Sequence, residues 1–302
     1  MPTDATISSL RAGDQVEGVF ACVRKDRRRT RTGSPYLALE LRDRTGSVPA
    51  RAFRDADVLS GRFERGDLVR VTGRVERFRD ELVVEVVDVR RADGAVNGSS
   101  EAETLVAEAF LPVAYRDMEE LDGFLEHLAR EVFDPGYRAL LESLLGDAEF
   151  RAEFRRAPCS RAGHHAYLGG LIEHTVAVAT LARELCDLHR RLNSDLLLTA
   201  AIVHDIGRVR EFSYRVEIEL TPAGRLLGHL VLGQQLLADR FAVLGDVLDE
   251  ERRLALLHCV LCHHGPSAAP AGRFASAEAL ALYRLNALDA GVKGVLEHGL
   301  DG

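Results

Sequence analysis

Short runs of alternating apolar and polar residues fill the first third of the chain. Leu37, Leu39 and Leu41 alternate with Tyr36, Ala38 and Glu40, and this period of two predicts a half-buried strand. Comparable runs at 14–25, 47–53, 67–78 and 81–91 predict four further strands, with a short polar, helix-like link at 54–65. Five such strands, with a connection between the third and the fourth, predict a small closed barrel of the OB-fold type.

The pattern changes to helical spacing in the second half of the chain. Residues 92–104 are small and polar, without apolar periodicity, and predict a linker. Beyond them one extended stretch is expected at 212–220, and Ser194 and Gly207 are expected to start and stop one of the helices. The predicted helical segments are 169–188, 194–207, 225–244, 250–265 and 276–292. We therefore expect a multi-domain protein, with an all-β barrel at 1–92, a linker at 93–104 and an all-α domain at 105–302.

The length and composition of the chain are typical of an ordinary cytoplasmic protein, and we expect it to be one. The 302 residues suit roughly two domains. The five cysteines are odd in number and scattered, which argues against a disulfide framework. The first residues lack the layout of a signal peptide, and no apolar run approaches the ~20 residues that cross a bilayer. We expect no membrane partner.

The net charge of −8 conceals an asymmetry between the two halves. Residues 1–91 carry 19 Lys and Arg against 15 Asp and Glu, whereas the remainder carries 20 against 32. The basic run at 24–33 is predicted as a loop whose arginines, Arg27, Arg28, Arg29 and Arg31, contact phosphates. Tyr36 and Phe53 are predicted to project outward beside it and to stack on unpaired bases. A solvated loop and ordinary surface aromatics are the alternatives.

Buried ionisable residues mark the helical half. His204 and Asp205 interrupt the apolar run "LTAAIVHDIG", and burying both is costly unless each is paired or binds a metal. Further histidines and one acid lie on separate predicted helices, which can direct them to one centre, as in metal sites of helical bundles. Imidazole and carboxylate suit divalent transition metals without selecting one. "CVLCH" at 259–263 matches a haem-attachment pattern, but Cys259 and Cys262 lie in an apolar helix and are expected to fill the core.

The order of these motifs resembles the HD-domain superfamily of metal-dependent phosphohydrolases. "HHAYLGGLIEHTVAVA", "HDIGRVREF", "LLGHL", "HCVLCHHG" and "LNALDA" carry the resemblance. Joined to the N-terminal barrel, they are similar to the YhaM-type 3′–5′ exoribonucleases over nearly the whole chain. One departure is Arg208, where related sequences have Lys. Either residue places a cation near a phosphate, but Arg presents a fixed fork.

The resemblance implies a site and a reaction. Asp205 and Arg208 would be catalytic, with His164 and His165 orienting the substrate unless they form a solvated loop pair. Two divalent ions are implied, Mn²⁺ first, with Fe, Ni, Co and Zn left open. The first ion would be held by His174, His204, Asp205 and Asp289, and the second by His229, His263, His264 and the bridging Asp205, with His258 as an alternative ligand.

The substrate implied is single-stranded RNA, released as nucleoside 5′-monophosphates. Single-stranded DNA and a homo-oligomeric state are left open. The alternatives are an HD phosphohydrolase of nucleotides or cyclic dinucleotides, and a nucleic-acid-binding protein with an inactive HD domain.

Overall fold

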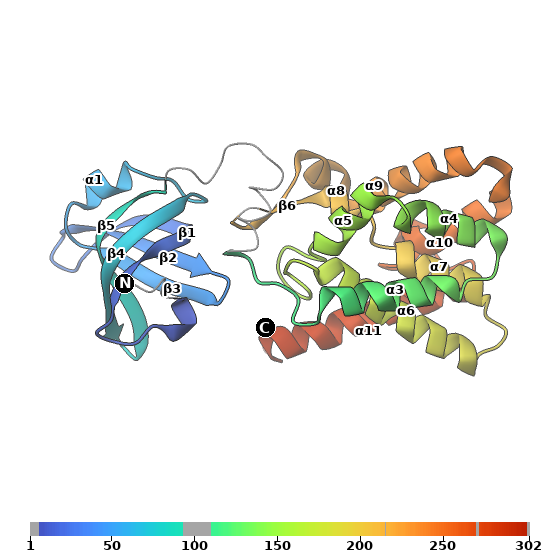
Figure 1. Ribbon diagram of the computed structural model, residues 1–302, viewed down its shortest axis with the longest axis horizontal. Helices are drawn as coiled ribbons and strands as arrows, with labels where there is room; N and C mark the ends of the chain where they lie inside the picture. Colours follow the sequence, from blue (N-terminus) through green and yellow to red (C-terminus); the bar gives the residue numbers. More distant parts are fainter. Residues whose placement is uncertain (1–5, 93–109, 215, 270–271, 301–302) are drawn as a thin grey trace. The chain divides into compact units, whose positions relative to one another are not determined.

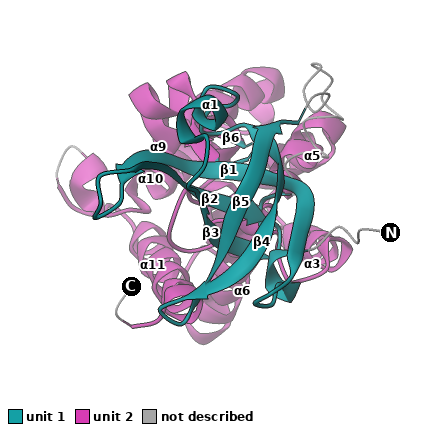
Figure 2. Ribbon diagram, turned by 90° about the vertical axis from the view of Figure 1, so that its left-hand side faces the viewer, with its two compact units in different colours: residues 1–112, 214–217 teal, residues 113–213, 218–302 magenta. Residues whose placement is uncertain are grey.

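The chain forms two compact units. The computed structural model describes residues 6–92, 110–214, 216–269 and 272–300. The first unit comprises residues 1–112 with 214–217, and the second comprises 113–213 with 218–302 (Figure 2). The predicted linker at 93–104 lies outside the described residues.

The first unit is a closed five-stranded barrel with the strand order β1-β2-β3-β5-β4. It closes through antiparallel pairing of β1 with β4 and parallel pairing of β3 with β5. Leu37, Leu39 and Leu41 all point into the barrel core, so the predicted alternation and the OB-type barrel are confirmed. The elements are β1 (Gln15–Arg29), β2 (Pro35–Asp43), β3 (Gly46–Ala52), α1 (Ala56–Ser60), β4 (Leu68–Phe78) and β5 (Glu81–Arg91), after a 3₁₀ turn at Ile7–Ser9.

The basic run at 24–33 is mostly strand, and its prediction as a loop was wrong. β1 continues to Arg29, and Arg28 pairs with Tyr36 across the β1–β2 hairpin. Only residues 30–34 form the turn between the two strands. The backbone N–H and C=O groups of these arginines form hydrogen bonds with β2. This strand pairing determines the local structure, although the polar composition of the run favours a loop.

The second unit is helical, as predicted. α6 is its central helix and packs against α3, α7 and α11 (Figure 1). A two-stranded sheet, β6 with β7, occupies the predicted extended stretch. No helix in the described part of the chain is long and apolar enough to cross a membrane. The elements are α3 (Met118–Arg130), α4 (Pro135–Leu145), α5 (Ala148–Arg156), α6 (Gly170–Leu188), α7 (Ser194–Val203), α8 (Arg208–Glu211), β6 (Phe212–Tyr214), β7 (Ile218–Leu220), α9 (Pro222–Leu244), α10 (Glu250–Cys262) and α11 (Ala277–His298), with 3₁₀ turns at Gly245–Val247 and Pro266–Ala268.

α7 carries the His-Asp pair at its C-terminal end, and both of its predicted boundaries were wrong. Asn193, rather than Ser194, caps the helix, because its side chain accepts a hydrogen bond from the backbone N–H of Leu196 at 3.0 Å. The helix ends at Val203, ahead of Gly207. Every residue from Leu196 to Val203 is buried, so α7 carries the pair into the interior of the unit.

Candidate active site

Asp205 lies at the centre of the buried histidines. Its Oδ1 lies 3.3 Å from Nε2 of His229 and 3.4 Å from Nε2 of His263. Its Oδ2 lies 3.9 Å from Nε2 of His174 and 3.8 Å from Nε2 of His204. Each carboxylate oxygen therefore faces a different set of imidazoles, which is the arrangement expected of a ligand that bridges two metal ions.

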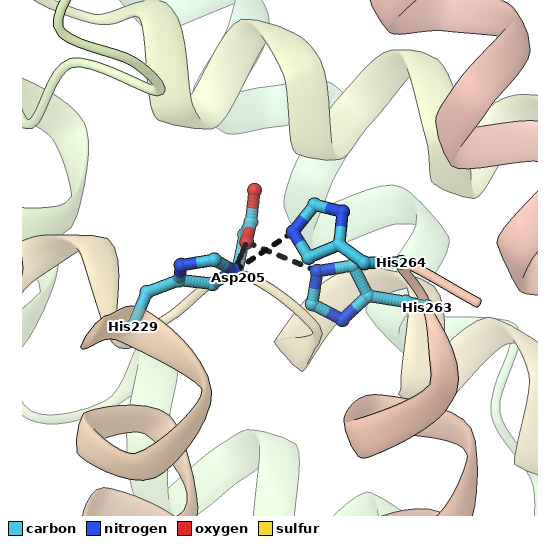
Figure 3. A group of neighbouring side chains, drawn as sticks. All are labelled: Asp205, His229, His263 and His264. Atoms are coloured by element: carbon cyan, nitrogen blue, oxygen red, sulfur yellow. Dashed lines mark hydrogen bonds and ion pairs between the residues drawn. The ribbon is translucent and has the colours of Figure 1, made fainter. Parts of the chain in front are cut away.

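The second group of predicted ligands is Asp205, His229, His263 and His264, which converge from three parts of the unit (Figure 3). One ligand atom from each lies within 4.8 Å of all the others. Nε2 of His229 and Nε2 of His264 are 2.9 Å apart. Among the described residues, neither Oδ1 of Asp205 nor Nε2 of His263 has a hydrogen-bond partner, although both atoms are buried. Orphaned donor atoms that face one another in this way fit a metal ion.

The first group is His174, His204 and Asp205, whose ligand atoms also lie within 4.8 Å of one another. Nδ1 of His204 lies 2.8 Å from the carbonyl oxygen of Ala201, which can only accept a hydrogen bond. The proton of the neutral ring therefore sits on Nδ1, and Nε2 offers its lone pair to the centre. Nδ1 of His263 makes the corresponding contact with a carbonyl oxygen at 2.6 Å.

Asp289, the fourth predicted ligand of the first ion, is placed differently. Its Oδ2 lies 2.6 Å from Nδ1 of His174, on the opposite side of the ring from Nε2. Asp289 groups with His165 and His174 and does not join His204 and Asp205. Burial alone would raise the pKa of Asp289, but hydrogen bonds from the two histidines lower it well below its usual range. In this arrangement Asp289 orients His174.

Burial lowers the pKa of three of the histidines at the centre. It lowers the pKa of His264 to about 3 and that of His164 to about 4, and it holds the pKa of His204 well below its usual value. Burial alone would raise the pKa of Asp205, but Arg208 and His204 outweigh it and lower that pKa well below normal. Neutral imidazoles around an ionised carboxylate are the forms that bind metal.

Arg208 is held between two carboxylates. Its Nε lies 3.3 Å from Oδ1 of Asp205, and its terminal nitrogen donates to Oε2 of Glu211 at 2.6 Å. Its side chain is 13% exposed. The predicted contact with a substrate phosphate would therefore use the guanidinium nitrogen that binds neither Asp205 nor Glu211. Glu211 was missed in the sequence, although an acid three residues after Arg208 is a standard helical pairing.

Glu211 also contacts a predicted ligand. α9 is broken at Gly228, where φ is 71°, so a new helical segment begins at His229. Oε1 of Glu211 accepts a hydrogen bond from the backbone N–H of His229 at 3.0 Å and lies 3.4 Å from its Nδ1. The backbone of His229 also lies very close to Gly207. A Cβ at position 207 would lie 2.0 Å from the carbonyl oxygen of His229, so only glycine fits there.

His164 and His165 do not form a solvated loop pair. His165 is buried, with Nε2 at 3.0 Å from Oδ2 of Asp289 and Nδ1 at 2.9 Å from the hydroxyl of Tyr167. The ring of His164 lies 5.3 Å from that of His174, centroid to centroid. The structure therefore places both histidines beside the first group of ligands. Their predicted contact with substrate stays a prediction.

His258 is not brought to either group. Its Nε2 accepts a hydrogen bond from the backbone N–H of Ala275 at 2.9 Å. His263 comes five positions later in the sequence, and at about 100° per residue this spacing places the two side chains about 140° apart around the helix axis. Cys259 and Cys262 are both fully buried and free of disulfides, as predicted for core residues.

On the barrel, the predicted aromatic pair lies beside a groove. The rings of Tyr36 and Phe53 are 5.4 Å apart, and Phe53 is 47% exposed. A hollow of about 270 Å³ on the outer face of β1, β2 and β3 is lined by Tyr36 and by Arg24, Arg28 and Arg51. Arg24 and Arg51 were missed, because strand alternation selects them only once the barrel register is known.

The four predicted arginines do not form one patch. Of them, only Arg28 lines the groove. Arg27 lies on the opposite side of β1. Its Nε donates a hydrogen bond to the hydroxyl of Ser60 at 3.2 Å, and its guanidinium forms an ion pair with Asp57 at 3.5 Å. Arg29 donates to a carbonyl oxygen of the turn at 2.9 Å, and Arg31 is an exposed residue of that turn.

Another exposed aromatic ring of the barrel lies at the β4–β5 turn and was also missed. Phe78 is 45% exposed, and the guanidinium of Arg51 lies 4.3 Å from its ring centroid. Arg79 lies 5.4 Å from the same ring. Exposed rings beside arginines are the composition of surfaces that stack unpaired bases.

Comparison with known proteins agrees with this geometry. The HD domain family matches residues 171–291, a range that contains the predicted metal ligands. The OB-fold nucleic acid binding domain family matches residues 20–91. The 3′-5′ exoribonuclease YhaM of Bacillus velezensis is 28% identical over 253 residues, covering 84% of this chain and 77% of that protein. The chain is thus similar in sequence to the YhaM exoribonucleases over most of its length.

Other similarities cover either most of the chain or the barrel-sized part of it. The YhaM proteins of Bacillus subtilis and Oceanobacillus iheyensis are 28% and 27% identical, and each match covers 84% of this chain. Among solved structures, the second OB-fold domain of replication protein A from Methanococcus maripaludis covers 32% of this chain at 19% identity, with a TM-score of 0.26. The HD domain implies dependence on a divalent metal, and the His-Asp groups provide ligands for it.

Proposed function

We propose that this protein is a metal-dependent 3′–5′ exoribonuclease that releases nucleoside 5′-monophosphates from single-stranded RNA. The observation that carries the proposal is the carboxylate of Asp205, whose two oxygens face two separate groups of histidines. Homology to the YhaM exoribonucleases supplies the substrate and the direction of cleavage. Every predicted ligand except Asp289 lies in one of these two groups, which argues against an inactive HD domain.

Two divalent ions are proposed, with Mn²⁺ as the first choice. His174, His204 and Asp205 would hold one, and Asp205, His229, His263 and His264 the other. Such a pair supplies Lewis acidity to the scissile phosphate and lowers the pKa of the attacking water. Asp289 orients His174, while Arg208 balances the charge of Asp205 and presents its outer nitrogens to a phosphate oxygen.

The barrel is proposed to bind the RNA strand. The groove between Arg24, Arg28 and Arg51 provides cations for phosphates, and Tyr36 and Phe53 provide faces for bases. Because stacking and phosphate contacts do not read the sugar, single-stranded DNA would also bind this face. The proposed boundaries are a barrel at 1–92, a linker at 93–104 and a catalytic domain at 105–302. Five free cysteines suit the reducing cytoplasm.

The test is digestion of a 5′-labelled single-stranded RNA. With Mn²⁺ we expect a ladder of labelled products that shortens steadily from the 3′ end, and with chelator no cleavage. A parallel reaction with 3′-labelled RNA should release the label first as a mononucleotide. Hydrolysis confined to free nucleotides or cyclic dinucleotides would overturn the proposal in favour of a small-molecule phosphohydrolase.

A further inference from the structure

An asparagine side chain faces the first group of ligands from α11. Asn286 is almost completely buried, with 5% of its surface exposed. Its Nδ2 donates a hydrogen bond to the carbonyl oxygen of His263, at the C-terminal end of α10, at 3.2 Å. Because a carbonyl oxygen can only accept, the NH₂ group of the amide must lie on that side. Oδ1 therefore points the other way, where it lies 3.0 Å from Nε2 of His174.

This contact joins two acceptors. Nδ1 of His174 lies 2.6 Å from Oδ2 of Asp289, so the proton of the neutral ring sits on Nδ1 and Nε2 carries a lone pair. The amide oxygen of Asn286 also offers only lone pairs. The contact between Oδ1 of Asn286 and Nε2 of His174 is therefore favourable only when a proton or a metal ion lies between them.

Further acceptors meet at the same ring nitrogen of His174. Nε2 of His204 lies 3.2 Å from it, and the proton of the His204 ring is held on Nδ1 by the carbonyl oxygen of Ala201. A single proton bridges one of these contacts, whereas a metal ion binds all of the acceptors at once. Octahedral coordination with bonds of about 2.1 Å places neighbouring donors about 3 Å apart, which is close to the 3.0 and 3.2 Å found here. Oδ2 of Asp205, at 3.8 and 3.9 Å from the two rings, has to move about 0.8 Å closer to complete the set.

The resulting donor set carries little negative charge. With Asn286, the first position consists of two imidazoles, one amide and the carboxylate of Asp205, which the second position shares. Histidine binds metal in its neutral form, so Asp205 is the one charged residue among the proposed donors for two dications. Arg208, whose Nε lies 3.3 Å from Oδ1 of Asp205, offsets even that charge. Metal affinity follows the charge of the ligands, and hard cations with few protein carboxylates complete their coordination with phosphate oxygens of the substrate.

We propose that the amide oxygen of Asn286 is the fourth protein donor of the metal position formed by His174, His204 and Asp205, and that a phosphate oxygen of the substrate completes this position, so that its ion and the phosphate bind cooperatively. Carbonyl and carboxylate oxygens suit Mn²⁺, the first choice of the proposed function. By linkage, the ion strengthens phosphate binding by the same factor as the phosphate strengthens ion binding. The inference rests on the proposed two-ion centre, but its test measures binding and not RNA hydrolysis.

Manganese binding with and without a phosphate tests the cooperativity. The metal-free full-length protein is titrated with Mn²⁺ while free Mn²⁺ is measured by electron paramagnetic resonance, and the titration is repeated with adenosine 5′-monophosphate and with adenosine. We expect two ions per chain, of which the weaker one binds about tenfold more tightly with the nucleotide and is unaffected by adenosine. Equal Mn²⁺ affinities with nucleotide and adenosine, or a single ion per chain in every titration, overturn the cooperativity.

Substitutions at position 286 test the ligand. Asn286→Asp adds a charged donor, so the weaker ion should bind at least about tenfold more tightly without nucleotide, and the nucleotide should then add little. Asn286→Ala removes the donor and should weaken the same ion at least about tenfold, as His204→Ala should. The matched control is Asn193→Asp, which adds the same charge at the opposite end of α7, where aspartate caps a helix as well as asparagine does.

The variants also separate this inference from the proposed function. Unchanged Mn²⁺ affinities in Asn286→Asp and Asn286→Ala, with folding checked by circular dichroism, overturn the ligand, and the alanine variant decides should the aspartate variant not fold. RNA hydrolysis by a wild type in which Mn²⁺ and nucleotide bind independently would reject this inference alone. Cooperative binding without RNA hydrolysis would reject the proposed function alone.

Discussion

The barrel groove and the histidine centre are built from opposite kinds of contact. In the groove, Arg24 and Arg28 are about half exposed and share Asp26 as a surface partner. In the centre, Asp205 and His263 are almost completely buried, and Oδ1 of Asp205 and Nε2 of His263 have no hydrogen-bond partner among the described residues. Exposed ion pairs are weak and screened by salt, whereas buried unpaired groups are costly unless something binds them.

The two regions therefore differ in how the loss of one residue affects their part in binding or cleaving the substrate. A groove of exposed cations and rings adds many small contributions and tolerates the loss of any one of them. A buried centre with a shared carboxylate depends on every member, because removing one leaves the others without their counter-charge. Changes at the groove should therefore alter affinity gradually, and changes at the centre should abolish the reaction.

The largest effect is expected at Asp205. Asp205→Asn keeps the shape of the side chain but removes the charge that both groups of ligands share, so we expect hydrolysis to fall at least about 100-fold, or about 2.7 kcal/mol of barrier. RNA affinity, measured by fluorescence anisotropy, should stay within about twofold of wild type. His204→Ala should behave in the same way. A variant that keeps more than about a tenth of the wild-type rate would remove these residues from the centre.

Glu211 gives the next largest effect and tests the support around the centre. Glu211→Gln weakens the hold on His229 and Arg208, so the second ion should bind about 10–100-fold more weakly, as is usual when a residue that orients a ligand is lost. Isothermal titration with Mn²⁺ should show one site weakened and the other unchanged, with activity recovered at high metal concentration. Asp122→Asn is the matched control, since Asp122 is also buried and is bound by Arg151 and Arg155. Equal metal affinity in wild type and Glu211→Gln would deny Glu211 this role.

The groove should respond more mildly. Replacing Arg24, Arg28 and Arg51 with Ser should raise KM for RNA about tenfold with kcat little changed, because binding common to ground and transition states is removed. The slope of log affinity against log salt should flatten by about 2, given about 0.7 for each phosphate contact on a single strand. Arg27→Ser with Arg29→Ser is the control, since neither residue lines the groove. If the control flattens the slope as much as the triple variant, the groove is not where the strand binds.

The barrel and the helical domain also differ in which of their features the sequence could predict. Regular alternation gave the barrel, and apolar spacing with the His-Asp pair gave the helical domain, because these patterns are local. The sequence did not predict that Arg27 and Arg28 face opposite sides of β1, because that depends on a strand being there at all. The basic composition suggested a loop, and pairing with β2 made it strand.

The centre was predictable in its ligand types but not in its orientations. His174 and Asp289 were expected to share an ion, yet the side of the imidazole that meets the carboxylate depends on how α11 packs against α6. Asn286 carried no signal, since an asparagine in an apolar helix has no assignable partner until α11 packs beside His174 and His263. Tertiary contacts of this kind lie beyond any local pattern.

The smallest effect is expected at the two cysteines of α10. Cys259 and Cys262 are buried within the helical unit, and neither belongs to the His-Asp groups of the described residues. Cys259→Ala with Cys262→Ala should leave metal content and RNA hydrolysis unchanged and lower the free energy of unfolding by about 1 kcal/mol for each sulfur removed. Urea denaturation with elemental analysis measures both quantities on one preparation. Loss of metal without loss of stability would mean that α10 binds metal through its thiols. Cys259 and Cys262 would then belong to the metal centre and not to the hydrophobic core.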